Sequence, residues 1–212
     1  MSKTKWMLTT GYTQKTDYYK DAMALYESCQ KLGVFMEAMP YKSFGSWQAN
    51  AHYKGSLVLS SLKRHPTINI VWVDADALVL KYPKLFDELD CDIAGYHAEW
   101  PLNSGKMCFC SGTLFFRNCP AILELVKNWA IWSMQNVNNK KMLEQDYLGQ
   151  LIKSSNLVYQ ELPPEYCMVV APNPVPANWA PYIVKPGPIR DDVKIEDVVV
   201  MHTWGSRRHW KK

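Results

Sequence analysis

Two aspartates separated by one residue, Asp74 and Asp76, have the spacing in this sequence that most clearly allows chemistry. They follow an apolar run over residues 70–73, whose β-branched and aromatic side chains are typical of a buried strand. Side chains two apart in extended backbone point the same way, so both carboxylates can reach one point beyond the strand. Two anionic oxygens at one point suit a hard cation, Mg²⁺ or Mn²⁺. The alternative is that Asp76 caps a turn and Asp74 is solvated.

The segments that must position this pair alternate between strand and helix patterns. We expect strands over residues 6–10, 34–39, 70–73, 92–96, 107–117 and 198–201, and helices over 17–32, 50–64, 121–134 and from 143 onward. The acidic pair then follows the third strand of a βαβαβ series. This order predicts an α/β fold over residues 1–212: a single domain with a mixed, mostly parallel central sheet flanked by helices, and a ligand site at the carboxyl ends of the strands.

Composition narrows the possible partners. The formal net charge is +4 over 212 residues, which suits an anionic small ligand better than a nucleic acid. No apolar run approaches the roughly 20 residues that a membrane span needs. The first residues lack a secretory leader, which favours reduced thiols and a cytoplasmic location. The abrupt end at Lys212 is what a domain taken from a longer chain would show.

The six cysteines include no Cys-x-x-Cys pair, so a zinc knuckle is not expected. Cys108, Cys110 and Cys119 together with His97 form only a weak metal candidate. The proline-rich stretch over residues 172–188 is long enough to serve as a lid or as the wall of an acceptor site.

Several other residues could hold a ligand, each with a plainer alternative. Lys54, Lys63 and Arg64 are candidates for an anionic ligand, although a solvated helix face is the better explanation. Ser111 and Gly112 interrupt a strand, which indicates a bulge or a backbone close to a ligand.

Two further segments complete the set of candidates. Glu144, Gln145 and Asp146 open a helix, where acids either stabilise the helix N-terminus or point into a cleft. The last apolar strand delivers His202, for which a histidine bonded to backbone is the alternative.

These pieces occur in the order of a known pattern. The chain resembles GT-A nucleotide-sugar glycosyltransferases, and more loosely their retaining galactosyltransferase and glycogenin-like members and the chlorella-virus members that glycosylate the major capsid protein. The shared segments are residues 9–12, Asp-x-Asp at 74–76, Ser-Gly followed by Arg-Asn at 111–118, acid-Gln-Asp at 144–146, and His-x-x-Gly with a later basic residue at 202–208. Each motif is weak alone, and five in order make a strong case.

The resemblance implies a role for each matching residue. Asp76 and His202 would bind the metal, and Asp74 would share the metal or hold the ribose. Imidazole suits Mn²⁺ better than Mg²⁺. Gln145 and Asp146 would be catalytic. The nucleotide-sugar would be bound by Thr10, Gly11, Tyr12, Arg64, Asp74, Ala75, Ser111, Gly112, Gly205 and Arg208, with Arg208 on the diphosphate in place of the family's usual lysine. Glu144 also departs from the family, where aspartate is commoner.

The resemblance further implies a UDP-sugar donor, transfer of rhamnose or glucose with retention, and a glycan or glycoprotein acceptor. Two alternatives remain. One is a haloacid-dehalogenase-like phosphatase, which also carries Asp-x-Asp after an apolar strand, but normally after its first strand. The other is a catalytically inactive module that binds nucleotides or glycans.

Overall fold

A computed structural model describes residues 5–99, 107–139, 141–171, 187–188 and 192–203. The helices are α1 (Tyr18–Lys31), α2 (Trp47–His52), α3 (Lys54–Arg64), α4 (Leu85–Glu88), α5 (Pro120–Gln135) and α6 (Glu144–Lys153), with short 3-10 turns at Pro164–Tyr166 and Ile195–Asp197. The strands are β1 (Trp6–Thr13), β2 (Met36–Tyr41), β3 (Asn69–Val73), β4 (Ala77–Val79), β5 (Ile93–Glu99), β6 (Met107–Phe116), β7 (Tyr159–Glu161), β8 (Met168–Ala171), β9 (Gly187–Pro188) and β10 (Val200–His202).

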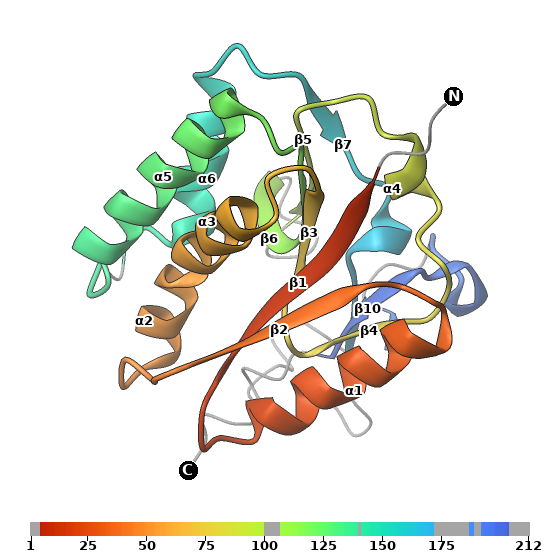
Figure 1. The fold of residues 1–212 in the computed structure, drawn as a ribbon. Helices are drawn as coiled ribbons and strands as arrows, with labels where there is room; N and C mark the ends of the chain where they lie inside the picture. The colour runs from red at the N-terminus through yellow and green to blue at the C-terminus, as the bar shows by residue number, and fades with distance from the viewer. Residues whose placement is uncertain (1–4, 100–106, 140, 172–186, 189–191, 204–212) are drawn as a thin grey trace.

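The central sheet has the strand order β2-β1-β3-β6-β5-β7. Only β6 runs against its neighbours; β1 pairs in parallel with β2 and β3, and β5 with β7. A smaller sheet, β4-β10-β8-β9, begins directly after the acidic pair. Helices α3, α5 and α6 gather on one side of the central strands, while α1 and the smaller sheet lie on the other (Figure 1). The expected α/β architecture with a mainly parallel sheet is therefore confirmed.

Both faces of the sheet are covered, and β3 shows this in its side chains. Val71 and Val73 belong to the core beneath α1 and α4, whereas Ile70 and Trp72 belong to the core beneath α3 and α5. Successive side chains of a strand point to opposite faces, so a strand buried on both faces must be apolar throughout. This burial is why β3 carries no polar residue between Asn69 and Asp74.

Three expectations about element bounds were wrong. The first strand continues to Thr13, because β1 pairs with β2 from Leu8 to Thr13. Pro40 lies inside β2, which is tolerated because β2 is an edge strand. The helix predicted over residues 50–64 is two helices, α2 and α3, separated at Tyr53. Gly55 lets α3 pack closely on α5, because a Cβ at this position would lie 3.0 Å from Trp129 and 3.1 Å from the Ala130 backbone.

Strand β6 bends where the site will form. Its second half, residues 113–116, pairs with β3, while residues 107–110 pair only with β5. The register between β5 and β6 shifts between Ala94 and Tyr96, so Ser111 and Gly112 fall in the irregular part. Bulges of this kind change the direction of side chains and are common beside functional sites. The Gly112 carbonyl accepts a hydrogen bond from the Asp74 backbone at 2.9 Å, which joins the bend to the acidic pair.

His52, at the end of α2, makes stability depend on pH. Its side chain has no solvent exposure, and this burial lowers its pKa below 6.5. The unfolded chain therefore binds a proton at His52 more readily than the folded chain does. The free energy of unfolding falls as the pH drops below about 6.5. Urea unfolding at about pH 7.5 and 5.5 will show a smaller pH-dependent loss for His52→Leu than for the wild type. Equal losses in the two proteins would contradict this.

Candidate functional site

Two separate strands bring three metal-ligand side chains together. Asp74 and Asp76 follow β3, and His202 ends β10. Strand β10 pairs antiparallel with β4, with His202 opposite Ala77, so the histidine returns to the acidic pair. Thr203 fastens this return by donating to the Asp76 carbonyl from its backbone at 2.9 Å and its hydroxyl at 2.8 Å. One potential ligand atom from each of the three residues lies within 4.8 Å of the others.

The surroundings of His202 fit a metal ligand. The ring is buried, and burial lowers its pKa to about 4, so the imidazole is neutral near pH 7, as coordination requires. Nε2 lies 2.9 Å from the Thr113 hydroxyl, a contact that orients the ring and leaves Nδ1 for a ligand. A Cβ on Gly112 would lie 3.1 Å from the ring, so glycine gives the histidine its space. Two carboxylates and an imidazole suit a divalent ion such as Mn²⁺.

Asp74 also belongs to a second polar cluster on the α3 side of the sheet. Its Oδ1 accepts a hydrogen bond from Trp72 Nε1 at 2.8 Å and lies 2.9 Å from Lys54 Nζ. Both contacts use Oδ1, which leaves Oδ2 for a metal or a hydroxyl group. The side chain is 35% exposed, whereas that of Lys54 is only 8% exposed. Asp74 therefore stands between solvent and a buried cation.

The buried cation is held by two further residues. Lys54 Nζ donates to the Ser111 hydroxyl at 2.8 Å and to its carbonyl at 3.1 Å, and it lies 3.3 Å from Glu144 Oε1. Ser111 in turn donates to Glu144 Oε1 at 2.9 Å. Burial alone would lower the pKa of Lys54, but Asp74 and Glu144 raise it, so the ammonium stays charged. Among the described residues, Glu144 Oε2 is buried without a hydrogen-bond partner.

The two acidic residues in the first turn of α6, Glu144 and Asp146, make different contacts. Asp146 accepts a hydrogen bond from the Leu143 backbone at 2.9 Å and so caps the helix. Glu144 instead points into the Lys54 cluster, and its carbonyl accepts from Trp129 Nε1 at 3.0 Å, which fixes the start of α6 against α5. Gln145, partly buried, lies between them. The structure thus brings Glu144 into the site and uses the carboxylate of Asp146 for the helix.

The expected nucleotide-binding residues Thr10, Gly11 and Tyr12 lie in β1, beside β3. Thr9 pairs with Trp72, so Gly11 is level with Asp74. Gly11 packs tightly against α3, because a Cβ there would overlap Leu57. Thr10 is buried, and the Tyr12 ring packs on Tyr19 at 5.8 Å. Ala75, also named for the nucleotide-sugar, is buried between the two aspartates.

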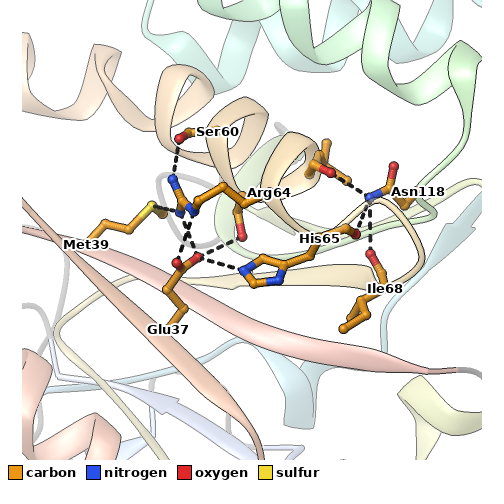
Figure 2. A network of polar contacts seen from close by, with 9 residues as sticks. Glu37, Met39, Ser60, Arg64, His65, Ile68 and Asn118 are labelled. Atoms are coloured by element: carbon orange, nitrogen blue, oxygen red, sulfur yellow. Dashed lines mark hydrogen bonds and ion pairs between the residues drawn. The ribbon is translucent and has the colours of Figure 1, made fainter.

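Arg64 is not brought to this site. It ends α3, about 15 Å along the helix from Lys54 at 1.5 Å per residue. Figure 2 shows its guanidinium beside Glu37, with Arg64 Nη2 2.8 Å from Glu37 Oε2 and Nε 3.2 Å from Oε1. Ser60 and His65 border the same pair. This arginine, paired with Glu37 at the far end of the helix, is not among the residues that contact Asp74, and its role at the sugar stays a prediction.

Other candidates also fall outside the site. Cys108 lies near the start of β6, whereas Cys119 lies past the end of this strand, at the residue before α5. At about 3.3 Å per residue along the strand, the two are too far apart to share an ion. In the described part of the chain, the one group of three or more possible ligands is Asp74, Asp76 and His202. Gly205, Arg208 and most of the stretch 172–188 lie outside the described residues.

Lys54 and Glu144 have a larger part in the site than the sequence led us to expect. Lys54 was grouped with Lys63 and Arg64, although Lys54, Val58 and Leu62 are spaced i, i+4 and i+8 and all three are buried. Residues with this spacing share a helix face, so Lys54 continues an apolar stripe. A lysine in such a stripe predicts a buried cation with a partner carboxylate. This spacing, which is visible in the sequence, could have identified Lys54 as a buried cation.

Comparison with solved structures places the fold. No protein-family pattern matches the chain, and no curated protein matches it in sequence. A glycosyltransferase involved in glycosylation of the major capsid of PBCV-1 superimposes with a TM-score of 0.63 at 17% identity, covering 95% of this chain and 96% of that one. GlyE from Streptococcus pneumoniae TIGR4 gives 0.61 at 13% identity, covering 93% of this chain and 55% of GlyE.

The galactosyltransferase LgtC, solved with donor and acceptor sugar analogs, gives a TM-score of 0.51 at 11% identity, covering 95% of this chain and 92% of LgtC. Likenesses at these identities show a shared fold. The chain has the GT-A fold, as the sequence resemblance predicted. Within the described residues, no helix is both long and apolar enough to cross a membrane.

The ammonium of Lys54 should be essential for stability. Lys54→Met leaves Glu144 and Asp74 facing each other without their cation, which costs about 3–5 kcal/mol when a buried pair is broken. Adding Glu144→Gln to this variant should recover part of the loss. Urea unfolding measures both, and Lys63→Met, an exposed lysine of the same helix, is the matched control. Equal stability of Lys54→Met and Lys63→Met would contradict the account.

Proposed function

We propose that this chain is a metal-dependent glycosyltransferase that transfers a sugar from a UDP-sugar to a glycan or glycoprotein acceptor. The observation that carries the proposal is that one aspartate, Asp74, belongs both to the metal-ligand group and to the buried cluster of Lys54. A metal-bound diphosphate and a sugar are parts of one molecule, so their sites must adjoin. The GT-A fold of the three solved glycosyltransferases supports the same conclusion.

The leaving group is the first requirement of this chemistry. Breaking the bond between anomeric carbon and phosphate oxygen places negative charge on the diphosphate of UDP. A divalent ion held by Asp74, Asp76 and His202 would stabilise that charge as a Lewis acid. The imidazole favours Mn²⁺ over Mg²⁺ as the resident ion. Arg208, with Gly205 before it, remains the proposed partner of the diphosphate.

The sugar would lie against the buried cluster. Glu144 Oε2 is an acceptor without a donor, and the hydroxyl groups of a sugar are donors that would satisfy it. Lys54 holds the carboxylates of Asp74 and Glu144 in place, and its charge opposes the rise that burial imposes on the pKa of Glu144. Ser111 and Gly112 would form the floor of the site, and Gln145 is proposed beside the anomeric carbon. Asp146, whose Oδ2 caps the helix that carries Gln145, stays proposed as catalytic together with Gln145.

The finer points of the reaction stay proposals. Thr10, Gly11 and Tyr12 would hold the uracil end, since β1 ends beside β3. Transfer with retention, and rhamnose or glucose as the sugar, are proposed from the family resemblance. A viral capsid glycan as acceptor rests on the resemblance to the PBCV-1 protein. A single domain over residues 1–212 and a cytoplasmic location likewise remain predictions.

Asp76→Ala tests the reaction and its metal together. Hydrolysis of a panel of UDP- and GDP-sugars with Mn²⁺ should select a UDP-sugar for the wild type. The variant should lose about 100-fold or more of this activity, because one ligand fewer removes several kcal/mol of charge stabilisation. Mn²⁺ should also raise the melting temperature of the wild type and not that of the variant.

Asp90→Ala is the matched control, since the Asp90 side chain is 96% exposed on the surface. Near-normal turnover in Asp76→Ala would contradict the assignment of Asp76 as a metal ligand. Release of phosphate from phosphomonoesters would favour the phosphatase instead. Binding of UDP-sugar without hydrolysis or transfer by the wild type would favour the inactive binding module.

A further inference from the structure

Another polar cluster, separate from that of Lys54, lies at the carboxyl end of β5 and serves none of the roles above. His97 Nδ1 lies 2.8 Å from Glu161 Oε2, and the His97 backbone N–H donates to Glu161 Oε1. The Tyr159 hydroxyl donates to the same Glu161 Oε2 at 2.7 Å. His97 and Glu161 side chains are 38% and 48% exposed, so a ligand can reach them. We call His97, Tyr159 and Glu161 the β5 edge cluster.

The hydrogen bonds of this cluster determine the form of the imidazole. Burial alone would raise the pKa of Glu161, but hydrogen bonds from Tyr159 and His97 lower it, so the carboxylate is ionised and can only accept. Nδ1 of His97 must therefore carry the hydrogen that it shares with Glu161. In a neutral ring, Nε2 then has a lone pair and no hydrogen. Within the described part of the chain, Nε2 makes no hydrogen bond of its own.

The cluster is next to the proposed sugar site. His97 pairs with Phe109 across β5 and β6, and Ser111 follows Phe109 by two residues, about 7 Å along the strand. Phe109 packs against the His97 ring at 5.2 Å and against Gly149. Gly149 lies one helical turn after Gln145 in α6. His97 therefore shares one side of the sheet with Ser111 and with the helix that carries Gln145.

We propose that His97 Nε2 accepts a hydrogen bond from the hydroxyl group of the acceptor sugar, with Glu161 as the positioning residue that holds the required tautomer. This inference rests on the proposed function. A hydroxyl held by His97 would lie on the same side of the sheet as Ser111, toward the edge of the donor sugar where the new glycosidic bond must form. The ligand class is a saccharide hydroxyl, because it can donate to a bare nitrogen without bringing a charge against Glu161.

Glu161→Gln is the sharpest variant, because it changes the tautomer while keeping the shape. The backbone N–H of His97 would hold the amide oxygen, so the amide NH₂ would face Nδ1 and donate to it. The hydrogen of the ring must then move to Nε2, which can no longer accept. Nitrogen-15 spectra of the labelled His97 ring should show Nδ1–H in the wild type and Nε2–H in the variant.

Activity should separate the acceptor from the donor. With Mn²⁺ and the UDP-sugar that the wild type hydrolyses, transfer to a panel of methyl glycosides is measured beside hydrolysis in their absence. His97→Ala and Glu161→Gln should keep hydrolysis within about twofold and lower transfer by about tenfold, the loss expected for one hydrogen bond to a ligand. This loss of transfer should appear as a higher KM for the acceptor glycoside. Glu88→Gln, at a carboxylate 58% exposed, is the matched control.

Other outcomes overturn the inference. Equal loss of hydrolysis and transfer would mean that His97 acts in the donor site or is needed for the edge of the sheet to fold. Unchanged transfer would mean that the cluster only links β5 to β7. A panel in which no glycoside raises turnover or shifts the Nε2 resonance of His97 also counts against it. A wild type that hydrolyses no UDP-sugar would instead overturn the proposed function, and this inference with it.

Discussion

The ammonium of Lys54 is the interaction on which the rest of this site depends. It lies among Asp74, Ser111 and Glu144, which come from three different segments of the chain. Two buried or half-buried carboxylates so close together would repel each other without it. A buried cation is costly to desolvate, and the fold offsets that cost only by supplying all three partners. The cluster therefore fixes where α3, β6 and α6 meet.

The bend in β6 makes this meeting possible. Ser111 faces Lys54 and Glu144, whereas the next residues, Gly112 and Thr113, contact His202 from the opposite side. A regular strand alternates its side chains and could not turn two neighbours to one face. The irregular register lets one short segment serve both the buried cation and the metal-ligand group. Asp74, whose backbone bonds to Gly112, joins the two halves into a single site.

The sequence foretold those parts of the structure that depend on local pattern. The α/β order, the strand before Asp74 and the end of the last strand at His202 all follow from runs of apolar residues that stop at a polar one. It could not rank Lys54 above Arg64, because both lie on one helix and only packing against β6 and α6 tells them apart. Lys54 and Ser111 are 57 residues apart, a contact that no periodicity encodes. For the same reason, the sequence could not show that Glu144 contacts Lys54 while Asp146 caps its own helix.

The central claim is that a metal and a uridine diphosphate share one site beside Asp74, Asp76 and His202. Calorimetric titration of Mn²⁺ into the protein, with and without UDP, measures this directly. The account predicts that UDP increases the affinity for Mn²⁺, and by thermodynamic reciprocity that Mn²⁺ increases the affinity for UDP by the same factor. Mn²⁺ binding that is absent, or that UDP leaves unchanged, would contradict it.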